Sequence, residues 1–197
     1  MGVNILVYLA TSAVGGDLQR RLALFGPAVA NGEWYRLLTS GFVHYGILHI
    51  AFNLLILYRF GEILEAALGR LRVTALYLAA LLAGSFGAVL LQPGVFTGGA
   101  SGAVFGLVGA AAVGLRQRGV DVWQSGVGPL LAINLFLTFA LPGISIGGHL
   151  GGLIGGALVG SVMLRTMGDH RAMAQGLAVA ALVAGVSVAG ALWAVHV

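Results

Sequence analysis

Long apolar runs that are poor in charged side chains fill most of this sequence, and they constrain its fold more than any other feature. Seven runs approach the roughly 20 residues that a helix needs to span the hydrocarbon core of a bilayer. They cover residues 2–14, 47–66, 73–92, 101–115, 122–141, 146–166 and 172–195, and the first is short. Backbone groups in lipid must be hydrogen-bonded within their own segment, so the runs predict an all-α, polytopic transmembrane helical bundle.

The composition indicates a single integral membrane domain over residues 1–197. Hydrophobic residues make up 59% of the chain and charged residues 8%, which excludes a water-soluble globule. The chain has no cysteine, so a thiolate metal site is excluded, and we expect neither a metal ion nor a cofactor. The run at 2–14 lacks a basic flank and a cleavage site, so we interpret it as a shortened first helix and not as a signal peptide.

The basic residues predict how the bundle is oriented. All ten are arginines scattered through short connections, which argues against a nucleic-acid partner. Seven lie in or near the connections of one side: Arg59, Arg70, Arg72, Arg116, Arg118, Arg165 and Arg171. Three, Arg20, Arg21 and Arg36, lie in the long segment 15–45. Cytoplasmic loops carry the excess of arginine, so 15–45 is predicted to be an outer loop of a protein in the inner (plasma) membrane.

Polar side chains from three predicted helices fall at the outer end of the bundle. His49 and Asn53 lie four residues apart on one helix face, Ser101 begins the next outward-to-inward helix, and His149 begins the one after. Each has a simpler explanation: a serine after glycines is most often a helix N-cap, and histidine or asparagine can bond to a neighbouring helix. Ionisable groups inside a membrane are nevertheless expensive and usually functional.

Small residues predict which helices touch. They recur every fourth position as Gly102, Gly106, Ala110 and Gly114 in one run and as Gly148, Gly152, Gly156 and Gly160 in another. Such stripes let two backbones approach closely, although they can equally pack against other helices or a second copy. If the two stripes meet, Ser101 and His149 face each other within hydrogen-bond reach. No carboxylate can be placed beside His149, so we expect a Ser-His dyad and no triad.

The chain resembles the rhomboid family of intramembrane serine proteases over nearly its whole length. The motifs that carry the resemblance are EWYRLLTSGFVH in the outer segment, HIAFN and GEILEAALG in the run 47–66 and just beyond it, GASGAVFGL at the start of 101–115, and GGHLGGLIGGALVG in 146–166. The resemblance is to the bacterial type and implies a rhomboid-like core of six helices, with 172–195 as an additional, seventh helix at the C-terminus.

The same resemblance implies roles for individual residues. Ser101 would be the nucleophile and His149 the general base and acid, with His49 and Asn53 helping to form an oxyanion hole and Gly99 shaping the loop beside it. Phe105 stands where some relatives have a tyrosine that packs on the catalytic histidine. The resemblance implies structural roles in the outer loop for Trp34, Arg36 and His44, although the aromatic residues and Arg36 of that loop also suit an anchor in the lipid headgroup region.

An intramembrane endopeptidase would cut other membrane proteins in or near their transmembrane segments. The expected partners are therefore transmembrane protein substrates and the lipid bilayer, and the sequence does not determine an oligomeric state. The resemblance implies substrate access beside the run 122–141 and beneath the cap LPGIS that follows it.

Two alternatives remain open from the sequence. One is a catalytically silent rhomboid-like protein that binds membrane clients, which intact Ser101 and His149 argue against. The other is a small transporter or channel, which would be expected to show internal repeats and deeply placed charge.

Overall fold

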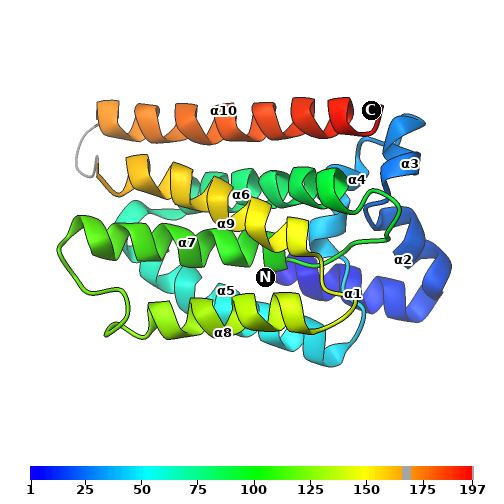
Figure 1. Ribbon diagram of the computed structural model, residues 1–197, viewed down its shortest axis with the longest axis horizontal. Helices are drawn as coiled ribbons and strands as arrows, with labels where there is room; N and C mark the ends of the chain where they lie inside the picture. Colours follow the sequence, from blue (N-terminus) through cyan, green and yellow to red (C-terminus); the bar gives the residue numbers. More distant parts are fainter. Residues whose placement is uncertain (166–169, 197) are drawn as a thin grey trace.

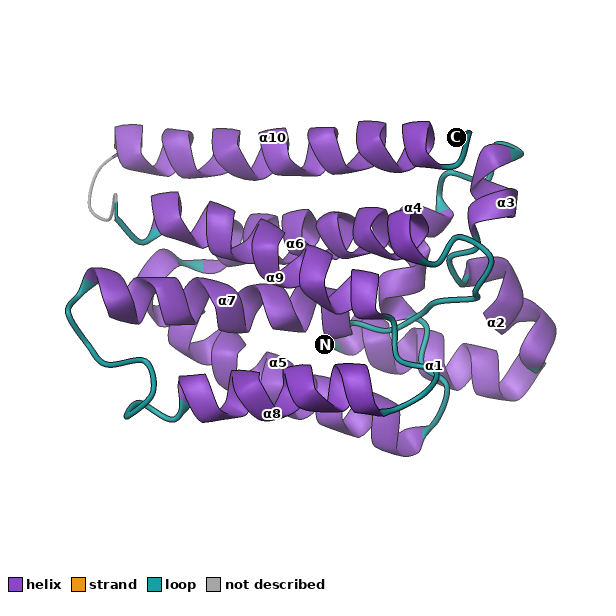
Figure 2. Ribbon diagram, viewed as in Figure 1, coloured by secondary structure: helices purple, strands orange, loops and turns teal. Residues whose placement is uncertain are grey.

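The computed structural model describes residues 1–165 and 170–196, and in this part of the chain helices form the whole architecture (Figures 1 and 2). The seven long helices are α1 (Gly2–Val14), α5 (Ile47–Leu68), α6 (Arg70–Leu91), α7 (Ser101–Gln117), α8 (Val127–Ala140), α9 (Ile146–Met163) and α10 (His170–Ala194). Between α1 and α5 lie three short helices, α2 (Gly16–Leu22), α3 (Gly26–Ala30) and α4 (Arg36–Thr39), and a 3-10 turn at Ser40–Phe42.

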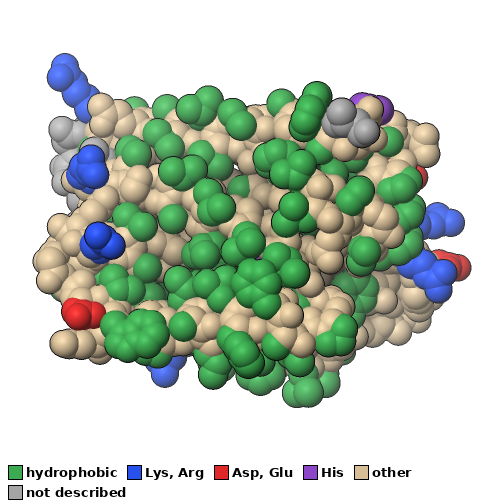
Figure 3. Space-filling model, viewed as in Figure 1, with side chains coloured by type: hydrophobic (Ala, Val, Ile, Leu, Met, Phe, Trp, Pro, Cys, Tyr) green, Lys and Arg blue, Asp and Glu red, His purple; other side chains and the backbone are tan. Residues whose placement is uncertain are grey.

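Four of the described helices, α5, α6, α9 and α10, are long and apolar enough to cross a membrane. The helices α1 and α8 are apolar but shorter, and α7 has 17 residues. On the face shown in Figure 3, charged side chains lie towards the two ends of the molecule, and the middle is largely apolar. This distribution is the one expected of a bundle that crosses the hydrocarbon core of a bilayer.

The centre of the bundle is formed by α6, α7 and α9. Figure 1 shows α10 above α6 and α9, then α7, with α5 and α8 below and the short helices α2 to α4 at one end. The core away from this end is formed by buried apolar side chains such as Leu76 and Leu107, which are fully excluded from solvent, together with Met163. The all-α bundle predicted from the apolar runs is therefore confirmed.

The stripes of small residues on α7 and α9 meet, which decides between the arrangements that the sequence left open. A Cβ added at Gly152 would fall on the backbone of Gly102, and one added at Gly156 would fall on the backbone of Gly106. One turn further along, a Cβ at Gly160 would lie 2.7 Å from Cα of Ala110. The glycines of α9 allow the two helices to approach this closely, because a side chain at these positions would overlap α7.

A second glycine face on α9, which the sequence analysis did not identify, packs against α6. A Cβ at Gly147 would overlap the backbone of Gly87, and one at Gly151 would overlap the carbonyl of Ala83. These glycines each precede a glycine of the stripe that faces α7 by one residue. The helix α9 therefore has two adjacent faces without side chains and packs between α6 and α7. Close contact on both sides fixes how far α9 can slide or rotate.

The start of the predicted helix at 122–141 is wrong by five residues, because α8 begins at Val127. The Asp121 carboxylate accepts hydrogen bonds from the backbone N–H groups of Trp123 and Gln124, at 2.7 and 3.1 Å, and so holds the chain in a turn. Gly126, with φ of 84°, ends that turn in a left-handed conformation suited to glycine. The predicted end of the sixth run, at residue 166, lies outside the described residues.

Arg36 lies inside the outer segment and not at its surface, so it is not a headgroup anchor. The side chain is 6% exposed, its guanidinium donates to the backbone carbonyls of Arg20 and Ala23, and it pairs with Glu33 at 2.7 Å. These bonds join α4 to the end of α2, so Arg36 braces the segment 15–45 internally. Trp34, by contrast, is 66% exposed, in a position compatible with an interfacial anchor.

His44 connects the outer segment to the start of α7. Its Nε2 accepts a hydrogen bond from the backbone N–H of Ala100, at 3.4 Å, and its Nδ1 lies 3.1 Å from the carbonyl of Phe42. Its own carbonyl accepts from the Gln19 side chain at 2.9 Å. Burial, together with the nearby His49, lowers the pKa of His44 to about 4, so its imidazole is neutral at pH 7.

Replacing Gly156 by Ala should destabilise the bundle, because the added methyl group meets the backbone of Gly106 and not a movable side chain. We expect a loss on the order of 1–3 kcal/mol and a lower midpoint of thermal unfolding in detergent, followed by circular dichroism. Gly61→Ala is the matched control, since a Cβ there meets nothing within 4 Å. Equal midpoints for the two variants would contradict the close packing of α7 and α9.

His44 should make the stability of the protein depend on pH. Its pKa is lower in the folded state than the ordinary 6.5, so the unfolded chain binds more protons between pH 6.5 and about 4. The contribution of neutral His44 is therefore complete above pH 6.5 and is lost as the pH falls towards 4. Unfolding midpoints in detergent should fall more steeply over this range in the wild type than in His44→Gln. Parallel pH curves for the two proteins would contradict this assignment.

Candidate active site

Ser101 and His149 lie opposite each other at the ends of α7 and α9. The Ser101 Oγ atom is 2.8 Å from Nε2 of His149, which is hydrogen-bond distance. Ser101 is the first residue of α7, Ala100 is its N-cap, and the cap makes no side-chain hydrogen bond. The N-cap explanation for Ser101 is therefore wrong, because its hydroxyl is directed to the histidine of the neighbouring helix.

The glycine contact between α7 and α9, which we call the seam, brings Ser101 and His149 close to each other. Gly102 directly follows Ser101 on α7, Gly152 lies about one turn after His149 on α9, and the backbones of the two glycines are in contact. Ser145 caps the first turn of α9 by accepting a hydrogen bond from the N–H of Gly148 at 3.1 Å. The start of α9, and with it the position of His149, is thus fixed by packing on one side and by a cap on the other.

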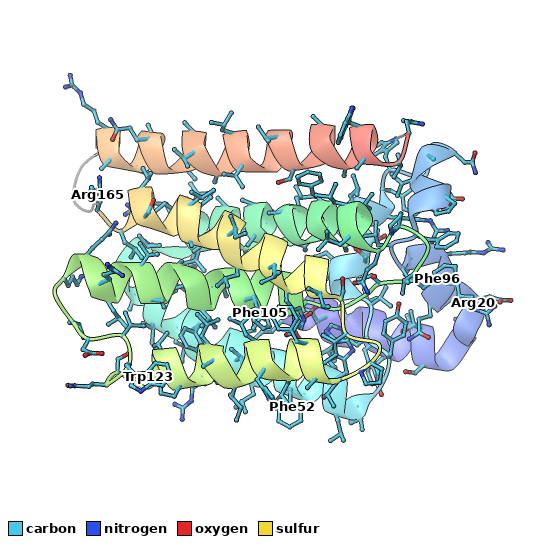
Figure 4. The ribbon with its side chains drawn as sticks, in the orientation of Figure 1. Arg20, Phe52, Phe96, Phe105, Trp123 and Arg165 are labelled. Carbon is cyan, nitrogen blue, oxygen red and sulfur yellow. The ribbon has the colours of Figure 1, made fainter. Side chains whose placement is uncertain are left out.

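Phe105 forms one wall of the site. Its ring stacks on the imidazole of His149 with centroids 4.2 Å apart and planes inclined by 22°. Phe105 is one turn after Ser101 on α7, so both side chains reach the same histidine. Figure 4 shows Phe105 inside the bundle, where α7 and α9 meet, whereas Phe52 on α5 points away from it. The ring restricts the orientation of the imidazole without offering a hydrogen bond.

His49 reaches the site from α5. Its Nδ1 accepts a hydrogen bond from the backbone N–H of Tyr45 at 3.4 Å, and the Tyr45 ring stacks on it with centroids 6.2 Å apart. Because Nδ1 accepts, the proton of the neutral ring belongs on Nε2. A Cβ at Gly99 would lie 2.8 Å from that Nε2 and 3.5 Å from Ser101 Oγ, so the two atoms border the same small space.

Gly99 is required at its position for two reasons. Its φ of 141° lies in the region that side-chain-bearing residues avoid, and an added Cβ would collide with the His49 ring. Its N–H donates to the carbonyl of Ser40 at 2.9 Å, which ties the loop before α7 to the outer segment. The loop therefore passes close beside His49 and leads into Ser101.

Asn53 lies one turn below His49 and is buried. Its Nδ2 donates a hydrogen bond to the carbonyl of His49 at 2.8 Å, which uses one of the two amide hydrogens. The structure thus brings His49, Asn53, Gly99, Ser101, Phe105 and His149 to one end of the bundle, with His44 bordering them. Trp34 and Arg36 lie apart, in the outer segment.

Thr138 is the member of the site that sequence reasoning missed. Its Oγ1 lies 2.7 Å from Nδ1 of His149, on the side of the imidazole opposite Ser101. The group that contacts Nδ1 is thus a hydroxyl on α8, in the place where a triad would have a carboxylate. A signal was present, because Asn134 and Thr138 form a polar pair four residues apart in an otherwise apolar helix, as His49 and Asn53 do on α5.

A small apolar pocket adjoins the site between α5, α7 and α8. Phe105 and Asn134 line it together with Ile56, Val104 and Leu131. The helix α8 packs against α7 and α9 less extensively than these two helices pack against each other, and the pocket lies on this side of the site.

Comparison with known proteins shows the family to which the chain belongs. The profile of the rhomboid family, described as the Rhomboid domain, matches residues 31–166. The rhomboid protease GluP of Bacillus subtilis is 35% identical over 161 residues, covering 78% of this chain and 32% of its own length. YdcA of the same organism is 35% identical over 129 residues, covering 64% of this chain and 65% of its own.

A plant protein is also similar. RHOMBOID-like protein 4 of Arabidopsis thaliana is 33% identical over 144 residues, covering 69% of this chain and 36% of its own length. The chain therefore spans between a third and two thirds of the length of these relatives. The profile match covers well over half of this chain, and the matched segment contains the bundle from α4 to α9 and every residue of the site. This multi-pass membrane protein belongs to the rhomboid family.

Proposed function

We propose that this protein is an intramembrane serine endopeptidase that hydrolyses peptide bonds in or near transmembrane segments of other proteins with a Ser-His dyad. The observation that carries the proposal is the 2.8 Å contact between Ser101 Oγ and His149 Nε2. A serine hydroxyl is a weak nucleophile until a neighbouring base accepts its proton, and this contact provides that base. Both groups keep some exposure, so a substrate can reach them.

The reaction proceeds in two steps. Ser101 Oγ attacks the scissile carbonyl carbon while its proton passes to Nε2 of His149, and the imidazolium then gives that proton to the departing amine. In the second step His149 takes a proton from a water molecule, whose oxygen attacks the acyl carbon, and the imidazolium returns that proton to Ser101 Oγ as the carboxylate product leaves. The stacked Phe105 ring keeps the imidazole in one plane through both proton transfers.

Three groups support the developing oxyanion. The backbone N–H of Ser101 belongs to the first turn of α7, where N–H groups have no acceptor within the helix. The Nε2–H of His49 and the second amide hydrogen of Asn53 come from α5. The positive end of the α7 dipole adds to them, because Ser101 is the first residue of that helix. Fixed donors of this kind are the largest contribution to many acyl-transfer reactions.

A substrate must present its scissile bond in extended form, because a helix hides its carbonyls in hydrogen bonds. Segments with glycine, serine or proline near the bond are the expected targets, because helices unwind more readily at these residues. The flank between α5 and α8, with its pocket, is the expected route. The arginine-rich connections gather at the end opposite the site, so the site opens to the extracytoplasmic side of the inner membrane, where water is available.

A fluorophosphonate probe tests the dyad directly. Wild-type protein in detergent should be labelled and should cleave a transmembrane reporter substrate, and both activities should vanish in Ser101→Ala. His149→Ala should lower both at least 10³-fold while the circular dichroism spectrum stays unchanged.

Ser187→Ala is the control, since it removes a serine hydroxyl from within the bundle but on α10, away from the site. A folded wild-type protein that neither labels nor cleaves would contradict the proposal and favour a silent rhomboid-like protein that binds membrane clients. Labelling that persists in Ser101→Ala would exclude Ser101 as the nucleophile.

His49→Ala should reduce kcat by about 10²-fold and leave KM nearly unchanged, because its Nε2–H acts on charge that appears only in the transition state. Steady-state kinetics on the same reporter measure both constants. An increase in KM at constant kcat would instead indicate that His49 binds substrate in the ground state.

A further inference from the structure

We propose that Thr138 is a positioning residue that holds His149 in the tautomer able to accept the proton of Ser101. The inference rests on the proposed function. It adds Thr138 to the Ser-His dyad and assigns a donor and an acceptor to each hydrogen bond in the resulting chain. That chain runs from Ser101 through His149 and Thr138 to the backbone of Asn134.

The direction of this chain follows from its last member. Thr138 Oγ1 lies 2.7 Å from the carbonyl oxygen of Asn134, and a carbonyl can only accept a hydrogen bond. The single hydroxyl hydrogen of Thr138 is therefore used in that bond. The contact of 2.7 Å between Oγ1 and His149 Nδ1 then requires the hydrogen to come from Nδ1.

With Nδ1 protonated, a neutral imidazole carries a lone pair on Nε2. Nε2 is the atom that faces Ser101 Oγ, so the serine hydroxyl donates and the histidine accepts. The other tautomer would place a hydrogen on Nε2 and leave no acceptor for the serine proton. The hydrogen bond at one ring nitrogen thus determines what the other nitrogen can do.

Because Thr138 is buried, the His149 ring strongly prefers the tautomer that is protonated at Nδ1. The side chain is 1% exposed, and α8 otherwise buries only Gly128 among its residues. Without the Thr138 hydroxyl, the Nδ1–H of His149 loses the hydrogen-bond partner that the structure gives it. Leaving a buried donor unpaired is far more costly than losing an exposed hydrogen bond. The ring would then favour the tautomer that cannot accept from Ser101.

Two variants separate the hydroxyl from the shape of the side chain. Thr138→Val keeps the volume and removes the hydroxyl, and we expect kcat to fall on the order of 10- to 100-fold with KM little changed. Thr138→Ser removes a methyl group but keeps the hydroxyl, and it should retain most of the wild-type kcat. A purely structural role for Thr138 predicts the reverse order, with Ser at least as damaging as Val.

Thr11→Val is the matched control. The Thr11 hydroxyl is also buried and also bonds to the carbonyl four residues earlier, that of Val7, but it lies on α1 and does not contact His149. Its removal should leave kcat unchanged. A similar fall in kcat in Thr11→Val and Thr138→Val would assign the effect to the loss of any buried hydroxyl and overturn the inference.

A second measurement does not depend on activity. Nitrogen-15 NMR of histidine-labelled Ser101→Ala protein in detergent should show His149 protonated at Nδ1, and adding Thr138→Val should shift the ring towards Nε2–H. Protonation at Nε2 in the presence of Thr138 would overturn the inference. If the wild type cleaves by means of Ser101 and Thr138→Val cleaves equally well, the inference is overturned and the proposed function stands. If the wild type shows no Ser101-dependent cleavage, the proposed function itself is overturned.

Discussion

The close contact between the backbones of α7 and α9 is the constraint on which the rest of the structure depends. Where Gly106 meets Gly156, neither helix has room for a single methyl group, so their separation and register are fixed by main-chain atoms. Main-chain positions are far stiffer than side-chain rotamers. The packing of these two helices therefore sets the distance between Ser101 and His149, which are attached at their first turns.

Glycine packing also explains how polar chemistry is accommodated in an apolar bundle. Association of helices in lipid cannot rely on the hydrophobic effect, since lipid tails are as apolar as leucine, so it depends on close van der Waals contact. The two glycine faces of α9 provide that contact towards both α6 and α7. The helices therefore associate without polar contacts, and polar side chains such as Ser101 and His149 at the ends of α7 and α9 are available for the site.

The loop before α7 is held from outside the bundle. Arg36 braces the segment 15–45, His44 binds the N–H of Ala100, and the carbonyl of Ser40 binds the N–H of Gly99. The outer segment thus supports the residues immediately before Ser101. Its polar groups are satisfied mostly by backbone partners, which explains why buried charge is tolerated there. The site consequently depends on three supports: a helix seam, a loop anchor, and the hydroxyl of α8 behind the imidazole.

The sequence by itself determined the bundle, its main helices and the candidate pair Ser101 and His149, because the length of apolar runs and the spacing of polar residues are local patterns. It left open whether the small-residue stripes of α7 and α9 meet, which the packing of the helices decided. Only the tertiary structure decided that Arg36 lies inside the outer segment, that α8 begins after a turn capped by Asp121, and that Thr138 stands behind His149. These features depend on where side chains from distant segments end up relative to one another. A hydroxyl in an apolar helix has the same local pattern whether it faces lipid or a histidine, and only packing between helices distinguishes the two.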